Sequence, residues 1–327
     1  MKALSVVILA MPNAMALDII GPSDVFHNAN RVQKEDQFRQ AITYDISVVS
    51  TQKDKLVKTS SGLVISCDMS IYEFDGHIDT LIVGGFSMDY DWHDHPEVVN
   101  WLKGKSAGIR RIAAVCLGAF LLAEAGLLQN KNATTHWVNS KALGRLYQGI
   151  KVQTGPIFIK DQNIYTSAGA SAGIDLSLAL VEEDNGRPMS LKIAKLLVLY
   201  QKRTGSQEQV SEILLDQEAT KKPIYELQQW VKNNLNKHLS NKLLSEKAMM
   251  SERNFSRIFQ AEIGTTPAKY IEKVRVESAK RYLEYSNDSL AKIASNCGFK
   301  SADTMRKIFI RLLNVSPHYY RKHFGQL

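Results

Sequence analysis

The sequence predicts an α/β unit with a doubly wound, mostly parallel sheet, followed by an all-α unit with two helix-turn-helix motifs. Three observations support this expectation. Short apolar runs alternate with helical stretches over residues 1–185, one segment repeats at an offset of 50 residues near the C-terminus, and positive charge is concentrated in the last third of the chain. The 327 residues suffice for two domains, each with its own core.

The apolar runs of the first unit have the length of buried strands. We expect strands at 4–9, 44–50, 80–83, 112–115 and 164–166. Helical patterns lie between or after them, at 22–29, 96–102, 118–125 and 173–182. Strands that alternate with helices predict a parallel sheet covered on both faces, and such sheets bind ligands at the carboxyl ends of their strands.

The repeat predicts two copies of a helix-turn-helix motif. Its matched positions are Ser251 and Ser301, Arg257 and Lys307, Phe259 and Phe309, Pro267 and Pro317, and Tyr270 and Tyr320. Each copy reads as a short helix, a turn and a second helix that a serine caps. In the second copy, the spacing of Met305, Ile308, Phe309 and Leu312 predicts that these side chains face the core.

The charge distribution separates a basic part from a nearly neutral one. Residues 219–327 contain 20 Lys and Arg against 9 Asp and Glu, a net charge of +11, whereas the remainder has a net charge of −3. A basic segment that carries two helix-turn-helix motifs indicates double-stranded DNA as the partner. We expect the first domain at 1–188, a connector at 189–222 and the DNA-binding domain at 223–327.

Cysteine usage and the N-terminus favour a cytoplasmic protein. Cys67, Cys116 and Cys297 are odd in number and far apart, so they predict no disulfide framework. Residues 1–16 imitate a secretory signal, but Lys2 alone is a weak basic region, and we expect a buried strand there instead. No apolar run reaches the ~18–20 residues of a membrane span.

The outward positions of the second helix in each motif are candidates for DNA contact, because a recognition helix reads base edges there. They are Arg253, Asn254, Ser256 and Arg257 in the first motif, and Lys300, Ala302, Thr304, Arg306, Lys307 and Arg311 in or beside the second. For Arg253 and Arg306, base contact and phosphate contact stay open. Lys280 is a further candidate for phosphate contact.

The C-terminal residues resemble the DNA-binding domain of AraC/XylS-family transcription regulators over about 224–324. The shared motifs are Met250-Ser251-x-Arg253-x-Phe255-x-Arg257-x-Phe259, Gly264-x-x-Pro267-x-x-Tyr270, Ile293-Ala294-x-x-x-Gly298-Phe299 and Ser316-Pro317-x-x-Tyr320. Met305 stands where the family usually has Phe, and Asn314 where it usually has Gly. The resemblance implies promoter DNA and RNA polymerase as partners.

Cys116 stands at an expected strand-to-helix elbow, a position that exposes a nucleophile in some hydrolases. The start of the following helix favours a thiolate there. Asp18 follows the first expected strand and His136 lies 20 residues after the cysteine, so both could meet the thiol above the sheet. The pattern alone leaves open whether Cys116 is a nucleophile with His136 as its base or a packed small residue.

Residues 1–185 also resemble the flavodoxin-like, amidotransferase-like domain of PfpI type. The shared motifs are Leu17-Asp18-x-x-Gly21-Pro22, Val83-Gly84-Gly85, Cys116-x-Gly118-Ala119, Ala133-Thr134-Thr135-His136-Trp137 and Thr166-Ser167-Ala168-Gly169. With the C-terminal match, the whole chain is similar to the GlxA-like subgroup of AraC regulators. Active proteases of the superfamily carry His directly after the nucleophile, where this chain has Leu117, so the resemblance implies a sensor without catalytic residues.

The sensor interpretation predicts a ligand site that is built from residues of several strand ends. Its expected members are Asp18, Gly85, Cys116, Leu117, His136, Trp137, Ser167 and Gly169. Asp18 and Trp137 suit a cationic, nitrogen-containing metabolite through charge and cation–π contact. We expect a homodimer, with no cofactor and no metal, since His93-Asp94-His95 has no second set of spaced ligands.

Three functions stay open at this point. The first is a metabolite-controlled transcription regulator, and more specifically an activator. The second is a hydrolase or amidase that uses Cys116 and His136 and is tethered to DNA. The third is a redox sensor in which Cys116 is oxidised.

Overall fold

The computed structural model describes residues 3–36, 42–87, 93, 95–210, 222–313 and 315–324. The chain divides into two compact units, Met1–Gln209 and Val210–Leu327, which are described separately. The first unit extends past the expected boundary at residue 188, because α6 (Arg187–Leu196) packs against α1 and α5. Backbone hydrogen bonds also join residues 205–209 to residues 155–158 of this unit.

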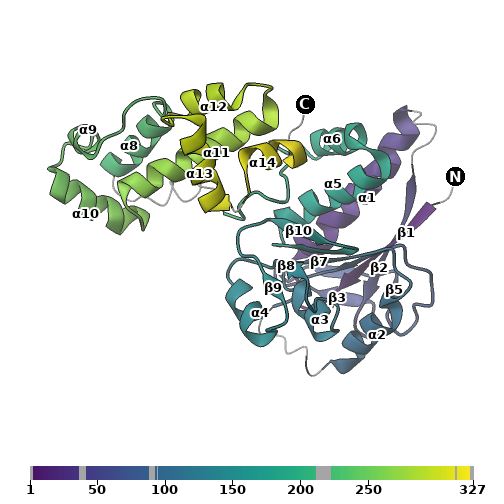
Figure 1. Cartoon of the computed structure of the whole chain (residues 1–327). Helices are drawn as coiled ribbons and strands as arrows, with labels where there is room; N and C mark the ends of the chain where they lie inside the picture. The colour runs from purple at the N-terminus through teal and green to yellow at the C-terminus, as the bar shows by residue number, and fades with distance from the viewer. Residues whose placement is uncertain are drawn as a thin grey trace. The chain divides into compact units, whose positions relative to one another are not determined.

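A seven-stranded sheet with the expected doubly wound topology forms the centre of the first unit (Figure 1). Its order is β10 (Phe158–Asp161), β11 (Ile164–Ser167), β7 (Arg111–Val115), β6 (Thr80–Val83), β1 (Ala3–Ala10), β2 (Thr43–Ser50) and β5 (Met69–Ser70). All neighbours are parallel except β10 and β11. The five main strands lie where the sequence predicts them, because most of their apolar side chains are buried between the two helical layers.

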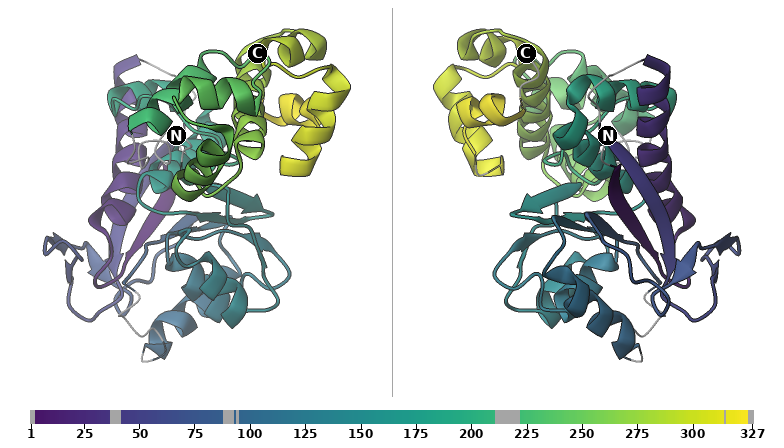
Figure 2. Two further views of the ribbon diagram at one scale, coloured as in Figure 1. Left: turned by 90° about the vertical axis from the view of Figure 1, so that its left-hand side faces the viewer. Right: turned by 90° about the vertical axis from the view of Figure 1, so that its right-hand side faces the viewer.

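Helices cover both faces of this sheet. One layer contains α1 (Ala16–Asp36), α5 (Ser171–Asn185) and α6, and the other contains α2 (Pro96–Ser106), α3 (Gly118–Glu124) and α4 (Ser140–Leu146) (Figures 1 and 2). The start of α1 differs from the expectation, since the helix begins six residues before Pro22 and contains that proline. Burial of Ile19 beneath the sheet edge favours the longer helix.

Short strands that the sequence does not reveal complete the unit. The hairpin of β3 (Leu56–Lys58) and β4 (Val64–Ser66) is largely exposed, and β8 (Asn132–Ala133) pairs with β9 (Lys151–Val152). Backbone bonds from Asn13 N to Lys58 O and from Ser60 N to Ala14 O hold the hairpin beside the start of α1.

The second unit is entirely helical among its described residues. Its helices are α8 (Lys222–Lys232), α9 (Asn241–Lys247), α10 (Glu252–Ile263), α11 (Pro267–Tyr285), α12 (Leu290–Asn296), α13 (Ala302–Leu313) and α14 (Pro317–Phe324). The first half of α11 contributes to one apolar core and its second half to another. The long helix is therefore shared by the two motifs.

The 50-residue repeat in the sequence is a repeat of contacts. Phe259 packs edge-on against Tyr270 with ring centroids 5.4 Å apart, and Phe309 packs against Tyr320 at the same 5.4 Å. The Ser251 hydroxyl accepts a hydrogen bond from Asn254 N, as the Ser301 hydroxyl does from Thr304 N. Matching caps and aromatic pairs fix each recognition helix in the same way.

Two expectations for this unit are wrong, and one lies outside the described residues. Leu312 is 37% exposed rather than packed, because it lies in the last turn of α13. Lys280 is 3% exposed and paired with Glu277, so it is not presented to a phosphate. Asn314 falls outside the described residues.

Gly298 lies where the two motifs pack closely against each other. Its φ is +76°, and a side chain there would overlap the carbonyl oxygen of Leu235, which also accepts a hydrogen bond from Arg275. Gly264 has a similar φ of +71° but open space around it.

We expect Gly264→Ala to lower the free energy of unfolding by about 1 kcal/mol, the cost of the left-handed backbone, and Gly298→Ala to lower it by several kcal/mol. Denaturant unfolding of the full chain measures both, and equal losses would contradict the steric argument.

Candidate functional site

Four strand ends meet at one edge of the sheet in the first unit. The strand register pairs Leu9 with Val83, Val83 with Ala114, and Val115 with Ser167, so β1, β6, β7 and β11 end at nearly the same level. The residues that follow these strands therefore converge. This edge is the place where doubly wound sheets carry their sites.

Cys116 occupies the sharp turn between β7 and α3. Its φ is +55°, in the left-handed region that residues other than glycine rarely adopt. The turn is held by a hydrogen bond from Cys116 N to Ser167 O at 3.1 Å. The predicted elbow is thus present, and it places the half-buried thiol at the edge of the sheet.

Asp18 is the polar partner of the thiol. It lies in the first turn of α1, is 1% exposed, and accepts a hydrogen bond from Ala170 N on Oδ1 at 2.7 Å. The Cys116 thiol donates a second hydrogen bond to the same carboxylate. Burial raises the pKa of Asp18 to about 6, against the lowering effect of these two bonds.

Gly85 and Gly169 allow this close arrangement. A side chain at Gly85 would overlap the Asp18 carboxylate and approach Cys116, and one at Gly169 would overlap Cys116 itself. Gly169 also has a φ of +92°. Both positions therefore need glycine to bring the carboxylate and the thiol together.

The expected thiolate is not what the surroundings favour. Burial and the neighbouring Asp18 charge raise the pKa of Cys116 to about 12, although the Leu117 backbone N–H lowers it. Desolvation and a like charge outweigh the dipole of α3, which has seven residues. At neutral pH the cysteine is a protonated thiol.

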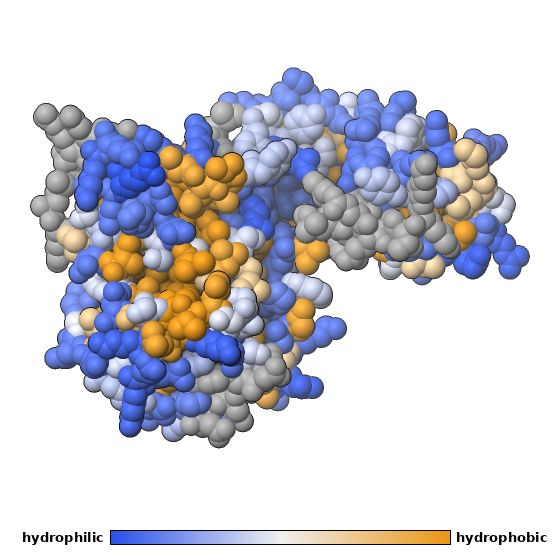
Figure 3. Space-filling model, turned by 180° about the vertical axis from the view of Figure 1, so that it is seen from behind, coloured by the Kyte–Doolittle hydropathy of each residue, from blue (hydrophilic) through white to orange (hydrophobic). Residues whose placement is uncertain are grey.

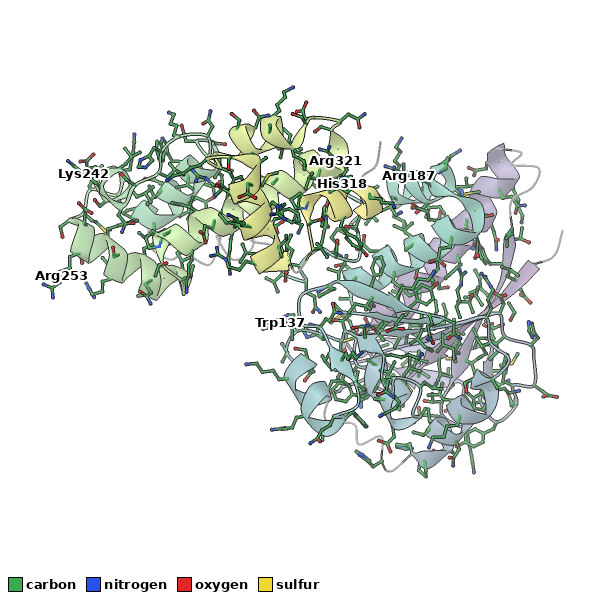
Figure 4. The ribbon with its side chains drawn as sticks, in the orientation of Figure 1. Trp137, Arg187, Lys242, Arg253, His318 and Arg321 are labelled. Carbon is green, nitrogen blue, oxygen red and sulfur yellow. The ribbon has the colours of Figure 1, made fainter. Side chains whose placement is uncertain are left out.

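His136 and Trp137 lie beside the elbow but are not bonded to the thiol. Thr135, the preceding residue, donates its hydroxyl to Cys116 O at 2.7 Å. Within the described part of the chain no hydrogen bond joins His136 to Cys116, and burial lowers the pKa of the imidazole. Its ring lies 5.8 Å from that of Trp137, which is 55% exposed at the surface of the unit (Figure 4). The structure therefore pairs Cys116 with Asp18 rather than with His136.

The remaining predicted residues are buried around the elbow. Leu117 is 4% exposed, and Ser167 is fully buried with a hydroxyl oxygen that has no hydrogen-bond partner in the described part of the chain. The sequence analysis missed Ala170 and Thr135 as members of this site. Ala170 contributes only a backbone N–H, which no side-chain pattern reveals, although Thr135 precedes the predicted His136.

The histidines near residue 93 do not form a metal centre with described neighbours. His95 contacts Glu97 at 3.2 Å and His93 lies 3.9 Å from Glu124, while Asp94 is outside the described residues. No group of three or more His, Cys, Asp or Glu side chains in the described ranges could hold a metal ion.

Among the described helices, none has both the length and the apolar composition of a membrane span.

The outward faces of α10 and α13 carry the predicted DNA-contact residues. Arg253, Asn254 and Arg257 are exposed on α10, and Ser256 is half-buried. Arg253 extends away from the helical unit (Figure 4). Arg257 donates a hydrogen bond to the Asn254 side chain at 3.0 Å, which holds both groups on one surface.

On α13 an acidic residue accompanies the predicted cations. Lys300, Arg306 and Lys307 are exposed, whereas Ala302 and Thr304 are half-buried. Asp303, which the sequence analysis did not consider, pairs with Arg306 at 3.3 Å and with Lys307 at 3.0 Å. Arg311 pairs with Glu272 of α11 at 2.6 Å. Asp303 therefore offsets part of the positive charge on the exposed face of α13.

Comparison with known families matches both units. The DJ-1/PfpI family pattern covers residues 4–183, and a helix-turn-helix domain pattern covers residues 244–323. The HTH-type transcriptional regulator Rv1931c of Mycobacterium tuberculosis is 30% identical over 269 residues, which are 79% of this chain and the whole of that protein. The HTH-type transcriptional regulator GlxA of Rhizobium meliloti is 26% identical over 82% of each chain.

Other relatives match only in part. The HTH-type transcriptional regulator GbdR of Pseudomonas aeruginosa is 28% identical over 222 residues, which are 68% of this chain but only 60% of that regulator's length. An enzyme, isonitrile hydratase of Pseudomonas putida, is 29% identical over 186 residues, 55% of this chain and 72% of the hydratase.

The raised pKa of Cys116 predicts slow alkylation that accelerates with pH. In the full chain, the rate of carbamidomethylation at Cys116 by iodoacetamide should keep rising through pH 9 to 11. Asp18→Asn should increase the rate at pH 8, because loss of the carboxylate charge lowers the thiol pKa. Peptide mass spectrometry measures the adduct, with Cys116→Ala as the blank. A plateau below pH 8 in the unaltered chain would contradict a protonated thiol.

Proposed function

We infer the function from two findings: the chain belongs to the DJ-1/PfpI family, and it carries the helix-turn-helix domain of AraC-type regulators, as its sequence predicts. We propose that it is a sequence-specific transcription regulator whose C-terminal unit binds double-stranded promoter DNA. Its relatives Rv1931c and GlxA carry the name HTH-type transcriptional regulator.

The duplicated motif is the observation that carries this proposal. Each copy ends in a capped helix with exposed basic or amide side chains. The helix α11 that joins them has 19 residues and is about 28 Å long, close to the ~34 Å repeat of B-DNA. One chain can therefore place α10 and α13 in successive major grooves.

The first unit is proposed to be the sensor that controls DNA binding. A small, nitrogen-containing metabolite would contact the edge of the sheet near Asp18, His136 and Trp137. A buried carboxylate and an exposed indole suit a cationic group. The effector changes output only if it binds two conformations with different affinity, and we propose that the active one recruits RNA polymerase as an activator does.

We further propose a homodimer that forms through the first unit. Apolar residues gather on one face of this unit in Figure 3. Its exposed apolar side chains include Met15 just before α1, Ile20 on α1, and Leu56, Leu63 and Val64 on the hairpin bonded beside it. A patch of this kind is typical of an association surface.

A DNA-binding regulator also implies a cytoplasmic location.

An enzymatic function is the second candidate. The similarity to isonitrile hydratase and the contact between a thiol and a carboxyl group favour it. Three observations argue for a sensor without turnover: the thiol has a raised pKa, Leu117 follows the cysteine, and no hydrogen bond among the described residues joins His136 to Cys116. Oxidation of Cys116 is a third candidate. The raised pKa of the thiol argues against it, because a redox sensor needs an accessible thiolate.

Substitutions on the recognition helices should separate base reading from phosphate contact. Arg257→Ala or Lys307→Ala should weaken binding to all duplexes and reduce the salt dependence of the dissociation constant. Arg253→Ala or Arg306→Ala should relax base preference at one position by about 1–3 kcal/mol. Affinity measurements on a duplex selected from a random pool, at several salt concentrations, test this. Identical behaviour of both pairs would show that the residues are wrongly sorted.

Effector binding should raise the thermal midpoint of the full chain. A panel of amino acids, betaines and polyamines should contain compounds that stabilise the protein by mass action. The effect should disappear in Asp18→Ala and His136→Ala but persist in Lys195→Ala, which removes an exposed charge on α6. Recovery of the compound unchanged supports a sensor, whereas its consumption would favour the enzyme.

A further inference from the structure

We propose that residues 203–209, here called the strap, transmit the state of the Cys116 site to the DNA-binding unit. This inference rests on the proposed function and identifies the element that regulates it. The strap is the last part of the first unit, and Val210 begins the second. Hydrogen bonds fix the strap at both ends to the elements that build the site.

Arg203 anchors the first end of the strap to α5. Its backbone N–H donates to Asp175 Oδ1 at 2.9 Å, its Nε donates to Asp175 Oδ2 at 2.8 Å, and a terminal guanidinium nitrogen donates to Ser171 Oγ at 2.8 Å. Asp175 is only 3% exposed, so the carboxylate of this charged pair is shielded from water, whereas the Arg203 side chain is 29% exposed. The anchored end of α5 begins directly after Ala170, whose N–H holds Asp18.

The middle of the strap runs beside the chain that leads into β10. Ile157 N donates to Gln207 O at 2.9 Å, Phe158 N donates to Gly205 O at 3.3 Å, and Gln209 N donates to Gly155 O at 2.9 Å. These bonds make the strap an added edge of the first unit. They also provide backbone amides whose protection reports whether the strap is attached.

Gln209 anchors the second end of the strap close to the elbow. Its side-chain nitrogen lies 3.0 Å from Thr134 Oγ1, 2.9 Å from Thr135 O and 3.1 Å from Pro156 O. Thr135 in turn donates its hydroxyl to Cys116 O. Thr135 therefore contacts the last residue of the strap on one side and the cysteine elbow on the other.

One polar atom of the Gln209 side chain is unfavourably placed in the attached strap. The carbonyl oxygen of its side chain is buried and has no hydrogen-bond partner among the residues that the structure describes. Burial of an acceptor without a partner is unfavourable, and detachment into water would remove that penalty. This penalty lowers the stability of the attached strap relative to a detached one, so a change at the elbow can shift their populations.

The first experiment asks whether the site and the strap communicate, and it needs no DNA. Thr135→Val removes the hydroxyl that donates to Cys116 O while keeping the size of the side chain. In hydrogen exchange of the full chain, the amides of Ile157 and Phe158 should then exchange about tenfold faster or more. Thr154→Val, at an exposed position nearby, should leave their exchange unchanged. Unchanged exchange in Thr135→Val would overturn the proposal.

The second experiment asks whether the strap controls DNA binding. Arg203→Ala and Gln209→Ala should both increase exchange at Ile157 and Phe158, and both should change the affinity for a duplex selected with the unaltered chain by about fivefold or more, in the same direction. Lys195→Ala removes a cation without touching the strap and should match the unaltered chain. Faster exchange with unchanged affinity would overturn the proposal.

The two experiments separate failure of this inference from failure of the proposed function. If the unaltered chain enriches no duplex from a random pool, the function as a DNA-binding regulator fails. The exchange measurement on Thr135→Val still decides whether the strap responds to the elbow.

Discussion

The buried carboxylate of Asp18 is the interaction around which the first unit is arranged. It follows β1, accepts a bond from Ala170 after β11, and contacts Cys116 after β7. Glycines at positions 85 and 169 provide the space that this convergence needs. The carboxylate is 1% exposed and its pKa is raised to about 6, so its protonation state depends on how far this edge of the sheet is buried from water.

The two recognition helices share their supports but differ in their surfaces. Serine caps and Phe–Tyr pairs repeat almost without change between α10 and α13. On α10 the guanidinium of Arg257 is bonded to a neutral amide, whereas on α13 Asp303 neutralises part of the charge of Arg306 and Lys307. Duplication thus preserved the packing that positions each helix while the residues facing outward diverged.

The sequence was sufficient for the features that depend on apolar periodicity and on repeated residues. The five main strands, the shared helix and the elbow at Cys116 all follow from such patterns, because buried strands and capped helices leave a local signature. The sequence could not reveal that Asp18 rather than His136 contacts the thiol, or that the thiol is protonated, because both depend on burial and on the N–H of Ala170. Lys280 shows the same limit, since an outward cation and a buried ion pair look alike in sequence.

The shared helix α11 also constrains how this protein can change over evolutionary time. Its two halves belong to different cores, so the number of residues between them sets both the distance and the angle between the motifs. One inserted residue would turn the second motif by about 100° relative to the first and shift it by about 1.5 Å. An insertion or deletion in α11 would therefore separate or misorient the two motifs, whereas exchange of side chains on α10 and α13 would change the target site and keep the half-site spacing.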